Sequence, residues 1–180
     1  MKKTLVSMLA AAAVVASVDA AQAQVTTPFS VEVRGGLVLP SGDLSDEDVT
    51  SGVGLNVNGQ FRFNPMFAAY AEFNWAQFGV EDEDDVDVTD QGFGAGVIAN
   101  FNAGSIQPFV KGGLVMHQFS VDDTDAEDEQ LGFRVGGGVS VPLGNRLSVT
   151  PGVTYTQYGF EDADFDISHI AVDVGLKINL

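Results

Sequence analysis

Four runs of acidic residues divide the chain at nearly constant intervals. The runs begin at Asp43, Glu81, Asp122 and Glu161. Their starts are 38, 41 and 39 residues apart, and a period near 40 is typical of a recurring supersecondary unit. Short turn signals lie midway between the runs, at 64–65, 102–105 and 143–145. Four long loops alternating with three tight turns make seven connections, which predict eight strands.

Between the acidic runs, apolar and polar residues alternate with the period of two that is typical of β-strands. At 53–63, for example, Val, Leu and Phe occupy one face, while Gly, Asn, Gln and Arg occupy the other. Six further segments follow this pattern, at 31–39, 67–77, 93–101, 106–121, 131–143 and 147–157. The barrel-closing strand is predicted at 170–180, with one face formed by Ile170, Val172, Val174, Leu176, Ile178 and Leu180.

The first 23 residues have the pattern of a secretory signal peptide. Lys2 and Lys3 precede an apolar stretch at 5–18, and the small residues Ala21 and Ala23 form a cleavage site. The apolar stretch is shorter than the roughly 20 residues that a membrane-spanning helix needs. We therefore predict a cleaved signal peptide at 1–23 and a single domain at 24–180.

The charge of the chain is concentrated rather than dispersed. There are 25 acidic and 8 basic residues, a net charge of -17, and the four runs hold 21 of the acids. Such a balance argues against nucleic-acid binding, which needs a basic surface. The absence of cysteine excludes disulfides, thiolate metal sites and a cysteine nucleophile. The high content of Phe and Val argues against disorder.

Two kinds of barrel fit eight strands with one apolar and one polar face. A soluble, lipocalin-like barrel turns its apolar face inward, whereas a transmembrane barrel turns it towards lipid. A polar face rich in Gly, Asn, Ser and Thr, strands of about 10 residues and long loops at one end only favour the second. Aromatic residues gather near both ends, as interfacial girdles do; those near the acidic loops are Trp75, Phe78, Phe93, Phe133, Tyr155 and Phe160. We predict an all-β fold, an eight-stranded antiparallel up-and-down transmembrane β-barrel.

Three segments carry a resemblance to a known family. They are Pro-Phe-Val-Lys-Gly-Gly-Leu-Val at 108–115, Gly-Phe-Arg-Val-Gly-Gly-Gly-Val at 132–139, and the strand at 147–159. With the strand at 170–180, they resemble the small eight-stranded outer-membrane β-barrels of diderm bacteria. That group includes the barrel domain of outer membrane protein A and the opacity-type surface proteins. The closing strand is similar to the signal read by the barrel-assembly machinery, although it ends in Leu180 where the family usually has an aromatic residue.

The resemblance implies a location and a set of partners. The protein is expected in the outer membrane of a diderm bacterium, with periplasmic termini and extracellular acidic loops. Its expected partners are outer-membrane lipid and lipopolysaccharide, the barrel-assembly machinery during insertion, and an extracellular ligand or surface. It is expected to be a monomer that binds no nucleic acid.

The strand phases place charged side chains inside the predicted barrel. The lumen network is predicted to consist of Glu32, Arg34, Arg62, Glu72, Lys111, Arg134, Asp173 and Lys177. Since isolated buried charges are costly, the three carboxylates are expected to pair with the basic residues. Side chains normally fill the interior of eight strands, which favours a polar plug. The alternative is a gate or a narrow porin-like channel for small or cationic solutes.

The third acidic run is the candidate metal site. Clustered carboxylates suit Ca²⁺ or Mg²⁺, but no run has the spacing of an EF-hand. Weakly bound Ca²⁺ or Mg²⁺ is the only cofactor considered, and the alternative is a solvated anionic surface, or an adaptation to salt. The candidate ligands are Asp122, Asp123, Asp125, Glu127, Asp128 and Glu129.

No catalytic residue is predicted. The only histidines are His117 and His169, and the nearby serines, Ser120 and Ser168, fall on the opposite faces of their strands. Both histidines are expected in the lumen or at its rim, without a partner in reach. The function favoured is a structural or surface-interaction role, then a narrow channel, and last an outer-membrane enzyme.

Overall fold

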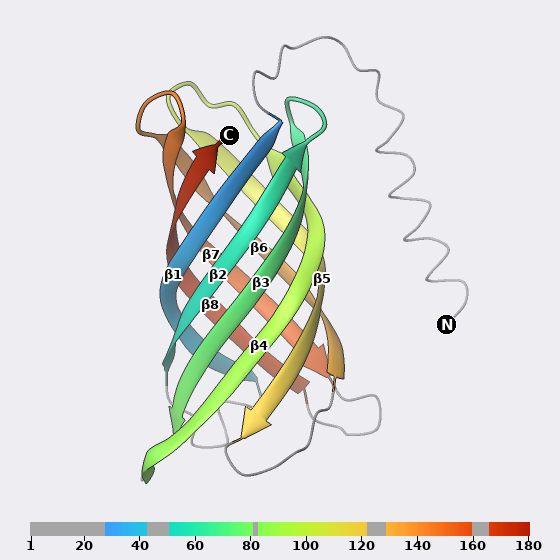
Figure 1. Ribbon diagram of the computed structural model, residues 1–180, viewed down its shortest axis with the longest axis vertical. Helices are drawn as coiled ribbons and strands as arrows, with labels where there is room; N and C mark the ends of the chain where they lie inside the picture. Colours follow the sequence, from blue (N-terminus) through green and yellow to red (C-terminus); the bar gives the residue numbers. More distant parts are fainter. Residues whose placement is uncertain (1–27, 43–50, 81–82, 122–128, 160–165) are drawn as a thin grey trace, which may run out of the picture.

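The computed structural model describes residues 28–42, 51–80, 83–121, 129–159 and 166–180. They form one closed antiparallel barrel in which each strand pairs with the next and β8 pairs with β1 (Figure 1). The predicted eight-stranded antiparallel barrel is therefore confirmed. Within the described ranges, no helix is long and apolar enough to span a membrane. The strands are β1 (Phe29–Gly42), β2 (Gly52–Arg62), β3 (Phe67–Val80), β4 (Glu83–Asn100), β5 (Gln107–Val121), β6 (Glu129–Pro142), β7 (Leu147–Gly159) and β8 (Asp166–Asn179).

The strands reach further towards the acidic runs than the sequence suggested. The second run was predicted as a loop, but β4 begins at Glu83, and Val80 pairs with Glu83 after a register shift. The prediction was wrong because the run itself alternates, as Asp-Val-Asp-Val at 85–88, and so continues the strand pattern. The hairpin of β3 and β4 extends beyond the neighbouring strand ends at the lower edge of Figure 1.

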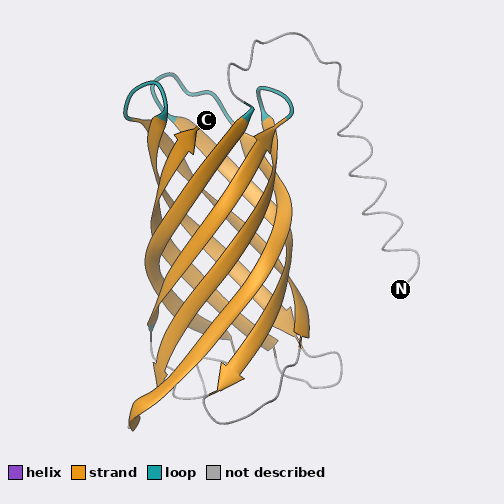
Figure 2. Cartoon of the chain, in the orientation of Figure 1, coloured by secondary structure: helices purple, strands orange, loops and turns teal. Residues whose placement is uncertain are grey.

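Three short connections close the opposite end, which we call the turn end (Figure 2). The side-chain oxygen of Asn64 accepts hydrogen bonds from the backbone N–H of Met66 at 2.8 Å and of Phe67 at 2.7 Å. The other two turns each contain a glycine with positive φ, Gly104 at 72° and Gly144 at 115°. The first and last strands also meet here, where Leu180 N–H donates to the carbonyl of Phe29 at 3.0 Å.

The outer face of the barrel is apolar. Large side chains stand exposed around the wall, among them Phe93 (68% exposed), Leu131 (63%) and Leu37 (58%). An apolar surface that continues over all strands is stable against lipid and not against water. The predicted inversion, apolar outside and polar inside, is thus confirmed. The assignment of Phe78 to the aromatic girdle near the acidic loops was wrong, because this side chain is 2% exposed and points inward with the even-numbered residues of β3.

Candidate functional site in the lumen

The first group of lumen charges centres on Arg34. Its Nη1 donates to Oε1 of Glu32 at 2.7 Å and to Oγ1 of Thr150 at 3.2 Å. Its Nε donates to Oδ1 of Asp173 at 3.0 Å, and Nη2 contacts the same oxygen. Glu32 Oε1 also accepts from Thr150, while Oε2 accepts from Asn58 at 3.2 Å. Oε2 accepts a second bond, from Gln60 at 2.9 Å.

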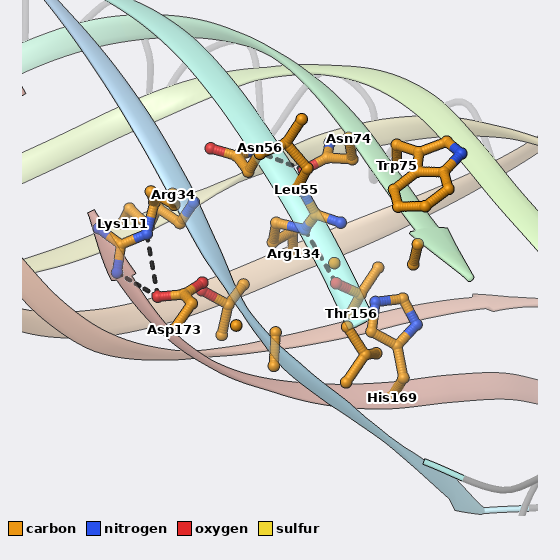
Figure 3. A pocket seen from close by; sticks show the side chains of 16 residues that line it. Arg34, Leu55, Asn56, Asn74, Trp75, Lys111, Arg134, Thr156, His169 and Asp173 are labelled. Carbon is orange, nitrogen blue, oxygen red and sulfur yellow. Dashed lines mark hydrogen bonds and ion pairs between the residues drawn. The ribbon is translucent and has the colours of Figure 1, made fainter. Parts of the chain in front are cut away.

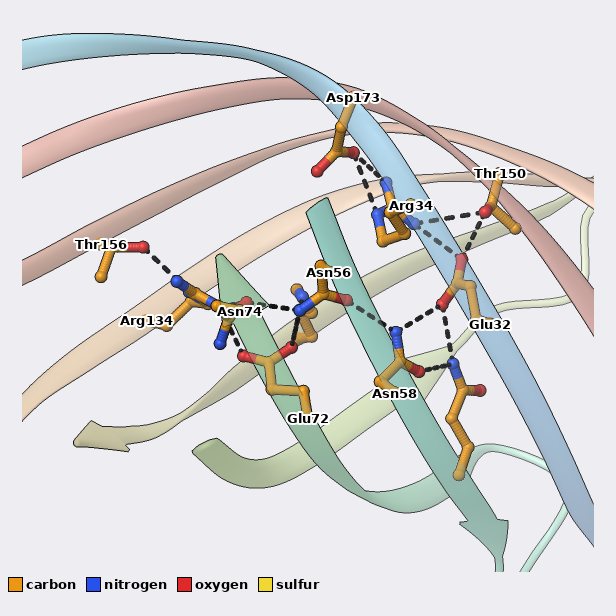
Figure 4. Close-up of polar contacts among 12 residues, drawn as sticks. Glu32, Arg34, Asn56, Asn58, Glu72, Asn74, Arg134, Thr150, Thr156 and Asp173 are labelled. Carbon is orange, nitrogen blue, oxygen red and sulfur yellow. Dashed lines mark hydrogen bonds and ion pairs between the residues drawn. The ribbon is translucent and has the colours of Figure 1, made fainter. Parts of the chain in front are cut away.

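The second group centres on Glu72. Its Oε1 accepts from Nη1 of Arg134 at 2.8 Å, and its Oε2 accepts from Nζ of Lys111 at 3.2 Å and Nδ2 of Asn56 at 3.0 Å. Arg134 is also fixed by Thr156, which accepts from its Nε at 2.9 Å. Figure 4 shows how these side chains converge from several strands.

The two groups form one layer, which we call the central network. Asn58 Nδ2 donates to Oδ1 of Asn56 at 3.0 Å and so connects them. The layer contains three cations and three anions, so that its charges balance. All six charged side chains are buried or nearly so. Balanced, hydrogen-bonded pairs avoid the penalty of an isolated buried charge. Its charged members are Glu32, Arg34, Glu72, Lys111, Arg134 and Asp173.

Glycines on the inward face make room for this layer. A Cβ added to Gly152 would lie 2.7 Å from Nη2 of Arg34, and one added to Gly175 would lie 2.8 Å from Oε1 of Glu32. A Cβ on Gly94 would lie 3.2 Å from Cγ of Glu72. The strand pattern placed glycine on the polar face but gave no reason for it; the available signal was glycine at inward positions of several strands.

The space left inside the barrel is small. A cavity of about 40 Å³ lies between the central network and the loop end, which is the end of the barrel opposite the turn end. It is lined by Arg34, Asn74, Arg134 and His169 among others (Figure 3). A second cavity of about 10 Å³ lies on the turn side, beside Glu32 and Tyr70. Spaces of this size accept one or a few water molecules.

The loop end of the lumen holds a cluster that the sequence analysis missed. Nδ1 of His117 lies 2.6 Å from Oδ1 of Asp90, and the hydroxyl of Tyr158 donates to Oδ2 of Asp90 at 3.1 Å. The His117 ring stacks on Tyr158 at 4.3 Å, and His169 stands edge-on to both rings. The expectation that His117 has no partner in reach was wrong. Asp90 was counted with the second acidic run, but it is 2% exposed inside the barrel.

An apolar layer supports the central network from the turn side. Tyr70, Ile98 and Phe109 are buried together with Ala68. The guanidinium of Arg34 lies over the Phe109 ring at 5.8 Å, and the ammonium of Lys111 lies over the Tyr70 ring at 5.5 Å. Such cation–π contacts stabilise charges that have left water.

Two predicted members of the lumen network stay outside it. Among the described residues, neither Arg62 nor Lys177 makes an ion pair within 4 Å. Both line a cavity of about 200 Å³ at the turn end. The structure therefore brings together six of the eight predicted charges and leaves two cations at one mouth of the barrel.

The remaining candidate residues are placed as follows. The side chains of Val172, Val174, Leu176 and Ile178 point outward from β8, and Leu180 follows directly after the strand. In the five described ranges, no group of three or more His, Asp or Glu residues is arranged to hold a metal. The candidate metal ligands Asp122, Asp123, Asp125, Glu127 and Asp128, and the side chain of Glu129, lie outside the described residues.

Comparison with known proteins identifies the architecture. A family model described as "Outer membrane protein beta-barrel domain" matches residues 8–177. The chain belongs to this outer-membrane β-barrel family. A search of curated protein sequences gave no significant match.

Solved structures similar to this outer-membrane β-barrel share its fold at low sequence identity. Neisserial surface protein A is 16% identical with a TM-score of 0.69, over 86% of this chain and 98% of that one. The N-terminal barrel domain of OprF from Pseudomonas aeruginosa is 14% identical with a TM-score of 0.54, over 84% and 97%. The outer membrane enzyme PagL is 18% identical with a TM-score of 0.54, over 84% and 99%. Neighbours that include a surface protein and an outer membrane enzyme establish the fold and do not assign a function to this chain.

Proposed function

We propose that this outer-membrane barrel is closed to solutes and has a structural or surface-interaction role, with the acidic loops outside the cell and the termini in the periplasm. The observation that carries the proposal is the central network. Its six charges pair with one another across the lumen, and the cavities beside it measure about 40 and 10 Å³. A path of this width holds isolated waters and no continuous aqueous column.

Conductance in planar lipid bilayers tests the closed lumen. The purified, refolded protein is expected to show no steady openings in 1 M KCl. Heat-modifiable gel mobility on the same sample establishes that the barrel is folded. Large, steady conductance from the folded wild-type protein would contradict the proposal.

A narrow channel is the second candidate, and one contact favours it. Glu72 is shared by two cations, Arg134 and Lys111, so that either bond is able to hold the carboxylate when the other breaks. If the network is a gate, Arg134→Ala raises conductance, whereas Arg62→Gln, outside the network, leaves it unchanged. Equal effects of the two substitutions would exclude a gate at Glu72.

The orientation is testable because the chain contains no cysteine. A single Ser45→Cys variant places one thiol in the first acidic run. Labelling of intact cells by a membrane-impermeant maleimide is expected for Ser45→Cys and not for Asn145→Cys in a turn.

Calorimetry with millimolar Ca²⁺ tests whether the acidic loops also bind a divalent cation, and absence of heat would leave them as an anionic surface.

The proposal includes no enzymatic activity. The paired His117 and Asp90 have the composition of a base and its orienting carboxylate. However, His117 is 0% exposed, and its Nε2 has no hydrogen-bond partner among the described residues. No described hydroxyl is therefore hydrogen-bonded to Nε2 of His117, as a nucleophile would be, and the buried ring offers a substrate no access from solvent. Hydrolysis of lipid or peptide by the purified protein would overturn this part of the proposal.

A further inference from the structure

Glu32 and Lys177 are directly opposite each other in the register of β1 and β8 and both side chains point inward. Cross-strand neighbours of opposite charge normally form a pair. Here Glu32 already accepts four hydrogen bonds, from Arg34, Thr150, Asn58 and Gln60. Since a carboxylate offers about four acceptor sites, Glu32 is saturated. Its cross-strand lysine makes no ion pair with it within 4 Å.

Lys177 is nevertheless 4% exposed, and among the described residues its ammonium makes neither an ion pair within 4 Å nor a hydrogen bond. A buried charge without a counter-charge is unfavourable unless a ligand or solvent compensates it. The central network compensates this charge only at longer range, through Glu32, because the three cations of the network already match its three anions. Lys177 is therefore an excess positive charge held near the turn end.

A second cation faces the same space. Arg62 and Lys177 line a cavity of about 200 Å³, which we call the turn-side mouth. The residues around it come from β2, β5, β6, β7, β8 and the turn after β6, so that it spans the lumen. No carboxylate side chain lines it, and its polar groups are the amides and hydroxyl of Gln107, Asn145, Ser148 and Asn179.

We propose that the turn-side mouth is a binding site for a phosphate or carboxylate group. A guanidinium binds either group through paired N–H donors, and an ammonium adds a point charge. Amide and hydroxyl groups complete the set of donors without introducing repulsion. The volume restricts the ligand to a small oxyanion or the charged end of a larger molecule. The site lies on the turn side of the central network, and binding does not require that the lumen conducts.

Titration with inorganic phosphate tests the site. The full barrel in dodecyl maltoside micelles is titrated by calorimetry and by amide chemical shifts. Millimolar binding is expected, and Arg62→Gln and Lys177→Gln should each weaken it about tenfold, the loss expected for one charged hydrogen bond. Arg146→Gln is the matched control, since Arg146 has the same charge at the same end but does not line the cavity. It should leave the affinity unchanged.

Several outcomes would overturn the proposal. They are no phosphate binding by the folded wild type, equal loss in Arg146→Gln, or unchanged affinity in Arg62→Gln. Because Arg62 lies at the rim, Arg62→Gln remains informative even if Lys177→Gln fails to fold. Nanodiscs distinguish the source of the anion. Weaker phosphate binding in phosphatidylglycerol than in phosphatidylcholine discs identifies a competing lipid headgroup, and equal binding identifies a soluble anion; both results support an anion site.

Discussion

Glu72 and Arg134 bond across the lumen, with Oε1 and Nη1 2.8 Å apart, although their strands β3 and β6 are not neighbours in the barrel. The backbone ladder connects only adjacent strands, so this contact joins opposite parts of the wall through the interior. It also places the negative charge of Glu72 beside Lys111. The stability of the wall thus depends on charge balance inside it.

Removing the charge of Glu72 is expected to destabilise the barrel strongly. Glu72→Gln leaves Lys111 and Arg134 buried without their shared anion, which costs about 3–5 kcal/mol. Urea unfolding in lipid vesicles, followed by tryptophan fluorescence, measures the loss. The double variant Glu72→Gln with Lys111→Gln should regain part of it. An identical loss in the single and double variants would show that unbalanced charge is not the cause.

Glycine at 175 is expected to tolerate no side chain. A Cβ there would contact Thr150, Glu32 and Arg34, all held in place by their hydrogen bonds. Gly175→Ala should therefore lower the free energy of unfolding by about 1–3 kcal/mol. Gly59→Ala is the control, since a Cβ at Gly59 meets nothing within 4 Å. Equal destabilisation by both substitutions in the same vesicle assay would contradict the role assigned to Gly175.

A charge on the lipid face should be costly in proportion to its depth. Val174 is 55% exposed in the middle of β8, and Val174→Arg should cost about 2–4 kcal/mol in vesicles. Leu143 is 57% exposed at the turn end, where the same change should cost about 0–1 kcal/mol. Equal costs at the two positions would show that the bilayer centre does not lie near Val174.

Asp90 is expected to organise the loop end of the lumen. Asp90→Ala leaves His117 and Tyr158 without the oxygens to which they bond, at a cost of about 1–3 kcal/mol. The Nδ1 proton of His117 should then exchange faster with water, which imidazole-detected NMR measures. Gln91→Ala, at the next position on the outer side, should change neither quantity. Retained protection of that proton in Asp90→Ala would contradict the proposed arrangement.

The wall of the barrel was predictable because its signal is local. Alternation at 53–63 and at 170–180 assigns each residue to one face, and a one-residue slip would expose the whole polar face to lipid. Phe78 and Asp90 were misplaced for a related reason. Both follow the inward phase of their strands, but each stands next to an acidic run, and the run was taken as the end of the strand.

The contacts inside the lumen were less predictable than their location. The strand phase places Arg34, Glu32 and Lys177 inside, but it does not say which cation the carboxylate accepts. That choice depends on the four donors around Glu32, which come from β1, β2 and β7 and not from β8. The pairing of His117 with Asp90 likewise joins residues 27 apart in sequence through the register of β4 and β5.

The contact between β1 and β8, from Ser30 opposite Asn179 to Gly42 opposite Ile167, joins the two most distant strands of the sequence. Until that seam forms, both strands present unpaired N–H and C=O groups, which hydrocarbon does not tolerate. A nascent chain that lacks its last strand therefore has no membrane-compatible fold of its own. A chain stalled before residue 166, where β8 begins, should therefore be a substrate for proteolysis rather than a partly built barrel.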